Sequence, residues 1–438
     1  MSGPAAPGRA RALATAGWGR ASREGGLAFA LMLAVALAIA LGAVALGVLG
    51  LRTADVLRVC GAYLALAHRV PLRVTAGGSD LLRARVIGAP AGTTALEARL
   101  AAAPLGLTAL AGWLLWRAGR RTAEAVGGSP GARALHGAKV GPVYAVLVLL
   151  ATLPVRMTLA PAGIDLHVEL SVPPGPALLL PLLLAAGVGA AGGWWSGTAR
   201  GLLRAAVLGG WTMLLAGLGL ALGGLFVAGV VRPDGPEALL TPTTGRYLRA
   251  VLARPSVGAA ALAHHVAALP NEAAWTLVPA MGGCTGAFPS VGEPSPFLCY
   301  GRFPRSVRLP VWLRPPGVGA GPPTRFGTAP WPYLLFLLAP AAATVLGGVR
   351  AARAEPGRAL AAAILAGAVF ALLVLALGWA SSISVSGAAR TSELTEVRSV
   401  RIGPGLGSGT ALALGWGVAG GALSGWSAAW RAGARRRS

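Results

Sequence analysis

The stretch Arg232–Pro330 decides how the rest of the chain is arranged; it begins RPDGPEALLTPTTGRYLRA (232–250) and ends LRPPGVGAGPPTRFGTAP (313–330). This run of about a hundred residues holds nine arginines, many prolines and two of the three cysteines, so it cannot be laid into a bilayer. On both flanks the chain consists of long, nearly charge-free blocks of Leu, Ala, Val and Gly. Such blocks are typical of transmembrane helices, and the stretch must therefore lie on one side of a membrane.

The composition excludes an ordinary soluble domain. Hydrophobic residues make up 55% of the 438 positions and charged residues only 12%. The net charge of +24 needs a partner, and nucleic acid is one interpretation. Basic residues scattered through membrane loops more often orient helices and face anionic headgroups. We therefore expect the lipid bilayer as partner and no nucleic acid.

The N-terminus allows two interpretations. Residues 1–26 are basic and polar, and they lead into the apolar block 27–51, which is also the layout of a signal peptide. That block has 25 residues, more than a secretory apolar region needs and enough to span a bilayer. The block therefore predicts an uncleaved first helix after a basic cytoplasmic N-terminus.

Apolar blocks predict an all-α integral membrane protein with about eight transmembrane helices. A first membrane region, 27–231, holds five spans, a second, 331–430, holds three, and a basic tail, 431–438, follows. The predicted spans are 27–51, 100–116, 140–157, 177–195, 205–231, 331–349, 359–379 and 410–430. Residues 232–330 then form a loop between the fifth and sixth spans.

Residues 54–70 are amphipathic, and they are interpreted as a helix on the membrane surface. The alternative is a crossing helix, but Arg58 and the pair His68-Arg69 leave too short an apolar core for it. Whether residues 54–70 and 257–281 are interfacial, re-entrant or spanning stays open at this point.

The distribution of basic residues predicts which side each loop occupies. With the N-terminus in the cytoplasm, the inside segments hold 18 basic and 3 acidic residues in 75 positions. The outside segments hold 19 basic and 11 acidic residues in 196 positions. Because cytoplasmic loops carry the excess of Arg and Lys, we expect a multi-pass protein of a bacterial plasma membrane. Both termini are then cytoplasmic and residues 232–330 extracytoplasmic.

Cys284 and Cys299 lie 15 positions apart in the predicted external loop. Two such thiols outside the cytoplasm should be oxidised, and closing a loop of that size contributes about 3 kcal/mol. Two unpaired small residues are the alternative, while a zinc site lacks a second Cys or His pair of suitable spacing. The pattern favours the disulfide.

Two glycine series have a four-residue spacing that predicts close helix packing. The first is Gly189, Gly193, Gly197 and Gly201, and the second is Gly417, Gly421 and Gly425. Little hydrophobic force acts between helices in lipid, so backbone contact across small residues holds them together. Chance is the alternative in a chain with 65 glycines, and both series are interpreted as helix interfaces.

The predicted spans lack the residues of catalysis and coupled transport. Apart from Arg156 near an outer end, they contain no Asp, Glu, Lys, Arg or His, whereas ion-coupled carriers place such residues near the midplane. His-Glu-x-x-His, Gly-x-Ser-x-Gly and Walker-type motifs are missing as well. We therefore expect no enzyme, with no catalytic residues, no cofactor and no metal.

One polar group of residues lies in Val257–Met281, where His264 and His265 precede Asn271 and Glu272. Two half-helices that meet at this polar turn could form a re-entrant ligand site of the kind transporters use. The simpler interpretation is that Asn271 caps a helix with Glu272 in its first turn, while the His pair lies at the interface.

The chain resembles the actinobacterial PerM-like cell-division membrane proteins and the related streptophobe family. The likeness rests on LALAHRVPLRV (64–74), PLGLT (104–108) with WRAGRR (116–121), LPN (269–271) with Trp275, and the Gly-rich final span. The segment from Met281 to Tyr300, with both cysteines, departs from the family pattern. The resemblance implies a non-enzymatic envelope protein linked to division or stress survival, with other envelope proteins as partners.

The sequence thus predicts a structural or interaction protein of the cell envelope. The alternative is a small-solute permease with a site near residues 264–272. A polar cavity lined by Tyr144, Thr152, Thr212 or Thr344 would favour that alternative.

Overall fold

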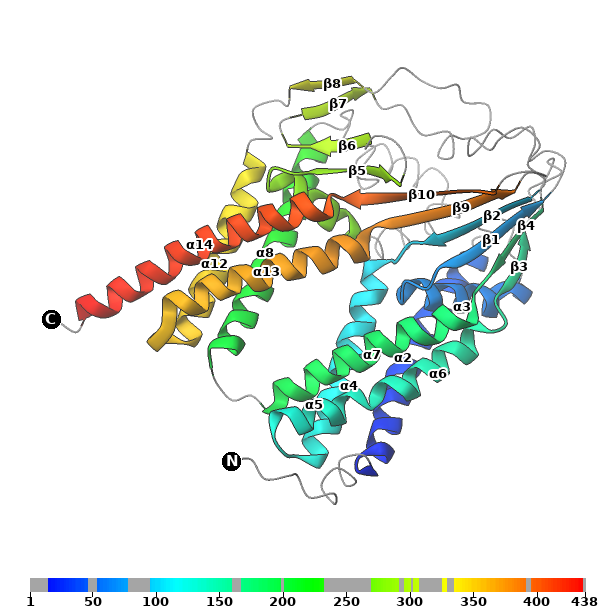
Figure 1. The fold of residues 1–438 in the computed structure, drawn as a ribbon, viewed down its shortest axis with the longest axis horizontal. Helices are drawn as coiled ribbons and strands as arrows, with labels where there is room; N and C mark the ends of the chain where they lie inside the picture. The colour runs from blue at the N-terminus through cyan, green and yellow to red at the C-terminus, as the bar shows by residue number, and fades with distance from the viewer. Residues whose placement is uncertain are drawn as a thin grey trace. The chain divides into compact units, whose positions relative to one another are not determined.

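The computed structural model describes eleven segments of the chain. They are residues 15–45, 53–77, 95–159, 167–197, 201–231, 269–290, 295–300, 302–306, 325–328, 335–390 and 395–435. Helices dominate these segments, and strands lie between some of the helices (Figure 1). The chain divides into two compact units, one built mainly from residues before 200 and one from residues after it.

The first unit is a helical bundle with short strands at one end. Its helices are α2 (Trp18–Ala45), α3 (Val56–Ala67), α4 (Leu105–Val126), α5 (Pro130–Ala138), α6 (Val140–Thr152) and α7 (Pro174–Gly197), with a 3₁₀ turn over Thr53–Asp55. Its strands are β1 (Leu72–Gly77), β3 (Arg156–Leu159) and β4 (His167–Ser171), and β2 (Ala95–Ala101) precedes α4. β3 and β4 form an antiparallel hairpin from the end of α6 to the start of α7.

The second unit has longer helices and a larger sheet. Its helices are α8 (Leu202–Val231), a helix over residues 269–280, α12 (Leu338–Ala354), α13 (Ala359–Ser381) and α14 (Leu406–Arg435), with a 3₁₀ turn over Pro356–Arg358. Its strands are β5 (Cys284–Pro289), β6 (Ser295–Cys299), β7 (Arg302–Ser306), β8 (Arg325–Thr328), β9 (Ile383–Arg390) and β10 (Thr395–Pro404). They are ordered β9-β10-β5-β6-β7-β8, with antiparallel neighbours.

Each unit has its own core. In the first unit, Met32, Leu64, Leu115 and Tyr144 are fully buried among α2, α3, α4 and α6. In the second, Ala residues of α13 and the side chains Met213, Leu277 and Phe370 fill the same role. Many core positions are Ala, since small side chains let the helices approach closely where lipid supplies no hydrophobic drive.

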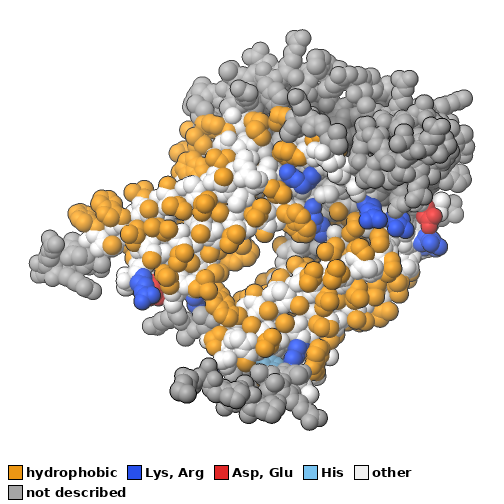
Figure 2. Space-filling model, viewed as in Figure 1, with side chains coloured by type: hydrophobic (Ala, Val, Ile, Leu, Met, Phe, Trp, Pro, Cys, Tyr) orange, Lys and Arg blue, Asp and Glu red, His pale blue; other side chains and the backbone are white. Residues whose placement is uncertain are grey.

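Seven described helices are long and apolar enough to cross a membrane, which makes the chain a helical membrane protein. They are Trp18–Ala45, Pro130–Thr152 (α5 with α6), Pro174–Gly197, Leu202–Gly224, Leu335–Ala354, Pro356–Ser381 and Leu406–Arg431. Described apolar side chains cover the lengths of the helices, as expected for surfaces in contact with lipid (Figure 2). The expectation of a helical membrane protein is confirmed at this level.

The predicted second span, 100–116, corresponds to α4, which differs from the seven. Its 22 residues are long enough, but Arg117, Arg120, Arg121 and Glu124 crowd its last three turns. It packs against α2 and α7 inside the first unit rather than lying apart from them. The apolar block that predicted this span therefore ends where the charged end of the helix begins.

The two units share one order of elements. In the described residues, each runs through a long apolar helix, a short amphipathic helix, two or more strands, two further helical spans, a β-hairpin and a last long helix. The short helices are α3 and 269–280, the hairpins are β3–β4 and β9–β10, and the last helices are α7 and α14. The strands were not predicted, because four to ten residues between apolar blocks give too short a pattern to separate a hairpin from a loop.

Candidate functional site

The strand-bearing end of the second unit is organised by the helix over residues 269–280. Its backbone ends in a left-handed turn at Gly282, where φ is +106°. The amide of Gly283 donates to the carbonyl of Val278 at 3.0 Å, and that of Gly282 donates to Pro279 at 2.9 Å. This pair of bonds satisfies the last carbonyls of the helix and turns the chain directly into β5.

Asn271 and Trp275 of this helix hold the end of α13. The side-chain amide of Asn271 donates to the carbonyl oxygen of Ser381 at 3.4 Å, and the indole N–H of Trp275 donates to the same oxygen at 3.1 Å. The interpretation of Asn271 as a helix cap at the start of its own helix is wrong, because residues 269 and 270 are already helical. Its amide instead serves the C-terminal carbonyls of another helix.

Glu272 lies next to Asn271 on the same helix and is partly buried. Burial raises the pKa of its carboxyl to about 8, because removal from water disfavours the charged form. This group is therefore mostly protonated at neutral pH. His264 and His265, the other members of the predicted ligand site, lie outside the described residues. A ligand at this site stays a prediction.

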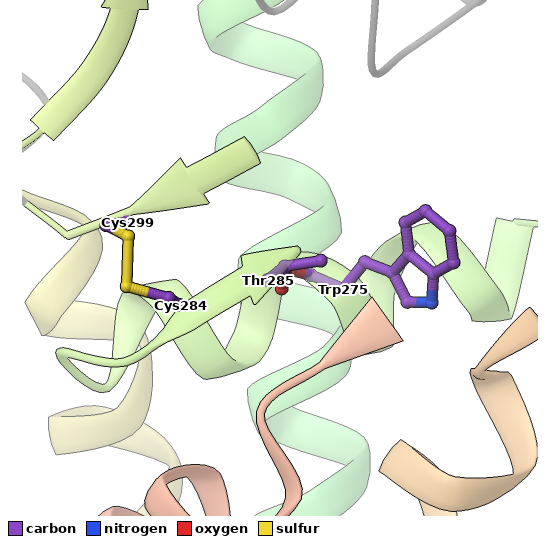
Figure 3. Close-up of a disulfide and its surroundings, with 4 residues drawn as sticks. All are labelled: Trp275, Cys284, Thr285 and Cys299. Carbon is purple, nitrogen blue, oxygen red and sulfur yellow. A yellow bond between two sulfur atoms is a disulfide. The ribbon is translucent and has the colours of Figure 1, made fainter. Parts of the chain in front are cut away.

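A disulfide joins the first residue of β5 to the last residue of β6. Cys284 and Cys299 are directly opposite in the antiparallel register, and their sulfur atoms are 2.07 Å apart. Next to the bridge, the hydroxyl of Thr285 donates to the carbonyl of Trp275 at 2.7 Å (Figure 3). The bridge holds β5 to β6, and the Thr285 bond holds β5 to the helix before it. The disulfide expected from the spacing is present.

Arg401 of β10 ties the hairpin to the same end of the unit. Its guanidinium donates to the hydroxyl of Ser382 at 3.1 Å and to the carbonyl of Pro404 at 2.7 Å. It also lies 4.6 Å above the ring of Phe288 on β5, within the range of a cation–π contact. All its partners belong to the fold, so Arg401 is positioned as a structural brace.

At the strand-bearing end of the first unit, His68 makes a hydrogen bond that joins two separate elements. The residue is 4% exposed; its Nδ1 lies 2.7 Å from the carbonyl of Leu64 and its Nε2 lies 2.9 Å from the hydroxyl of Tyr144. A carbonyl only accepts, so Nδ1 carries the proton and Nε2 accepts from the tyrosine. The pair joins α3 to α6, which are 76 positions apart in sequence at these residues.

The environment of His68 keeps it neutral. Burial lowers its pKa to about 4, against a small opposing effect of the hydrogen bond to Leu64. Both ring nitrogens are already used by the neutral form. A proton donor or a metal ligand would need one of them free, so this histidine is suited to hold α3 against α6.

The first glycine series faces α5. A side chain on Gly189 would meet the carbonyl oxygen of Gly137 at 2.5 Å, and one on Gly193 would meet the carbonyl of Arg133. Gly197 lies over Pro130, with 3.1 Å from its ideal Cβ position to the Cα of the proline. Gly201 is different, because it has a φ of +142°, precedes α8 and has open space around it.

The second glycine series makes the same kind of contact in the other unit. Gly417 meets the backbone of Gly367 on α13, Gly421 meets the carbonyl of Ala363, and Gly425 meets the Cα of Leu360 at 2.7 Å. Apart from Gly201, each series lies on the last long helix of its unit and packs against an earlier helix of the same unit. The interfaces are within one unit, between α7 and α5 or between α14 and α13.

The hydroxyls that could have lined a polar cavity are used locally. Thr152, Thr212 and Thr344 donate to carbonyls three or four residues earlier in their own helices, at 2.8 to 2.9 Å. Tyr144 donates to His68, as described above. Tyr144 and Thr152 belong to the first unit, and Thr212 and Thr344 belong to the second.

Sequence reasoning missed the residues that join distant elements. In the sequence, His68 is only a polar interruption of a short helix, Tyr144 is only a candidate cavity hydroxyl, and Ser381 has no local signal. Their partners lie 76 and 106 to 110 positions away, and no periodicity in one segment reports such a contact. Comparisons with protein-family models, with curated protein sequences and with solved structures found no match to this chain.

Proposed function

We propose that this chain is a non-catalytic scaffold of a bacterial plasma membrane. Its eight helices anchor an extracytoplasmic layer of strands that binds other envelope proteins. The role in cell division or envelope maintenance that the family resemblance implies belongs to this proposal. Both termini are placed in the cytoplasm.

The observation that carries the proposal is where the charged side chains lie. In the described spans and in α4, the Arg, Lys, Glu and His residues lie in the half remote from the hairpin of their unit. They lie toward the starts of α2, α8 and the spans Pro130–Thr152 and Pro356–Ser381, and toward the ends of α4, α12 and α14. Lys139, the tenth of the 23 residues of Pro130–Thr152, is nearest to the middle of its span. The strand-facing halves of these helices are apolar. A coupled carrier needs ionisable groups nearer the midplane, so this distribution favours an anchor over a transporter.

The packing of the helices supports the same conclusion. Backbone contact at Gly189 and Gly417 packs α7 on α5 and α14 on α13 without space for a side chain, and the threonine hydroxyls are satisfied within their own helices. Meanwhile the strand-bearing end of the second unit is braced by a disulfide and by Arg401. Closely packed helices below a braced strand-bearing end suit binding rather than passage of a solute.

The experiment is site-specific photocrosslinking in intact cells that express the full chain. A photoreactive residue replaces Arg156, whose side chain is 80% exposed on β3, or Leu183, which is 61% exposed on α7 in the middle of a span. We expect a discrete protein adduct from position 156 and none from position 183. Mass spectrometry should identify an envelope protein, and loss of that adduct should accompany an envelope or division defect.

The contrary result is equally clear. Saturable uptake of a small solute by proteoliposomes of the purified chain, without any adduct at position 156, would make it a permease. Hydrolysis or transfer of a substrate by the same preparation would make it an enzyme.

A further inference from the structure

The charged end of α4 carries an outward stripe of one tryptophan, two arginines and one glutamate. Trp113, Arg117, Arg120 and Glu124 follow each other at three- or four-residue steps and are all exposed. The opposite face of the same helix is buried, with Leu115 fully covered. This stripe therefore points away from the bundle of the first unit.

Two tryptophans hold the two arginines in place. The guanidinium of Arg117 lies 5.4 Å from the ring centre of Trp113, and that of Arg120 lies 5.9 Å from the ring centre of Trp116. Both distances are within the cation–π range. An indole prefers the headgroup level of a bilayer, so each ring fixes its arginine at the depth where lipid phosphates lie.

The surroundings are strongly basic. Among the described residues at this end of the first unit, seven are Arg or Lys and two, Glu24 and Glu124, are acidic. Glu24 is shared by Arg20 at 3.0 Å and Arg121 at 3.4 Å, so one carboxylate faces two guanidinium groups. Glu124 takes a 2.7 Å bond from Arg120. A positive excess remains for an anionic partner.

We propose that this stripe, with Arg117 and Arg120 on Trp113 and Trp116, is a binding site for the phosphate headgroup of an anionic phospholipid. Guanidinium groups bind phosphate oxygens through paired hydrogen bonds, and a stacked guanidinium is already oriented for them. The acyl chains of the lipid would lie along the apolar part of α4 toward Trp113.

The second unit supplies a matched control. Arg350 and Arg353 are also exposed in the last turns of a long helix, α12, at the corresponding place in the order of elements. The residues four positions before them are Leu346 and Val349 instead of tryptophans. They carry equal charge without the aromatic support.

The test is native mass spectrometry of the full-length protein in detergent, titrated with phosphatidylglycerol or phosphatidylcholine. We expect wild type to prefer phosphatidylglycerol. The double variant Arg117→Gln/Arg120→Gln should lose about 30-fold in affinity for it. Arg350→Gln/Arg353→Gln should lose about threefold at most, because its arginines are not held at headgroup depth. Phosphatidylcholine binding should stay unchanged in both.

Two further variants separate recognition from folding. Trp113→Leu/Trp116→Leu keeps every charge but removes the cation–π contacts of both guanidinium groups. We expect it to lose affinity for phosphatidylglycerol, by less than the Arg117→Gln/Arg120→Gln variant does. Glu124→Gln frees Arg120 from its ion pair and should bind phosphatidylglycerol more tightly, a gain that damage to the fold cannot produce. Circular dichroism checks that each variant keeps its helix content.

Three results would overturn the proposal. The first is that wild type binds phosphatidylglycerol and phosphatidylcholine with equal affinity. The second is that the two arginine double variants lose equal affinity for phosphatidylglycerol, which would show only a general electrostatic attraction. Competition by soluble glycerol phosphate as strong as that of the lipid would make the site a phosphate site rather than a lipid site.

Discussion

At the scale of single residues, His68 shows how one buried polar group can fix a helix to its unit. Its two ring nitrogens are used by Leu64 and Tyr144, so the neutral ring is fully satisfied. Thr108 adds a second bond at the same place, since its hydroxyl donates to the carbonyl of Ala67 at 2.8 Å. α3 is thus held at its C-terminal end by two hydrogen bonds to other elements.

The first prediction concerns the pH dependence of stability. The pKa of His68 is about 4 in the folded protein and about 6.5 in the unfolded chain. Between pH 4 and 6.5 the unfolded chain therefore binds more protons than the folded protein does. Stability should be complete above pH 6.5 and should decline as the pH falls toward 4, by up to about 3 kcal/mol. Thermal unfolding of the purified protein across this range measures it.

The variant His68→Gln serves as control. A glutamine amide can donate to Leu64 and accept from Tyr144, but it does not titrate. The acid-dependent part of the decline should therefore disappear. An unchanged decline in this variant would assign it to other groups. Tyr144→Phe, which leaves Nε2 of His68 without its donor, should cost about 1–3 kcal/mol at neutral pH.

At the scale of elements, the sequence and the structure agree best where a long apolar pattern exists. The blocks at 177–195 and 359–379 correspond closely to α7 and α13, since twenty apolar residues in succession leave few alternatives. The helices α2 and α4 extend further at their charged ends than the apolar blocks predict. A hydropathy pattern stops at the first charged residues, whereas the backbone hydrogen bonds of the helix continue through them. The Asn271 cap was misjudged because a cap and a mid-helix amide look alike in sequence.

The second prediction tests the glycine contacts of α7. Gly189→Ala places a methyl group against the backbone of Gly137, whereas Gly187→Ala, on the same helix, meets open space. We expect the first to destabilise the protein by about 1–3 kcal/mol through overpacking and the second to be neutral or slightly stabilising. Thermal unfolding in detergent distinguishes them. Equal effects would mean that α7 does not pack closely on α5.

The third prediction concerns the Cys284–Cys299 disulfide. Removing the bridge with Cys284→Ser should leave the helical bundles folded, because their backbone hydrogen bonds are satisfied within each helix. The sheet should become sensitive to protease, since closure of this 15-residue separation contributes about 3 kcal/mol. Limited proteolysis of wild type and variant, with circular dichroism as control, measures both effects. Equal digestion would assign the stability of the sheet to Arg401 and the hairpin.

At the scale of the whole molecule, the shared order of elements predicts how each unit crosses the membrane. If a unit contributes four crossings, an even number, it enters and leaves the membrane on the same face. Within each unit taken by itself, the hairpin then lies on the face opposite to the basic helix ends. The charge pattern predicts that the basic ends are cytoplasmic.

The fourth prediction tests this arrangement through α4, whose crossing decides between seven and eight spans. Its 22 residues extend about 33 Å, enough for the hydrocarbon layer, and its arginines belong at the cytoplasmic end. In a Cys60→Ala background, Arg156→Cys on β3 should react with an impermeant maleimide in intact cells. Ser129→Cys, between α4 and α5, should react only after permeabilisation. If α4 does not cross, position 129 becomes reachable from outside, position 156 is protected, and the two termini lie on opposite faces.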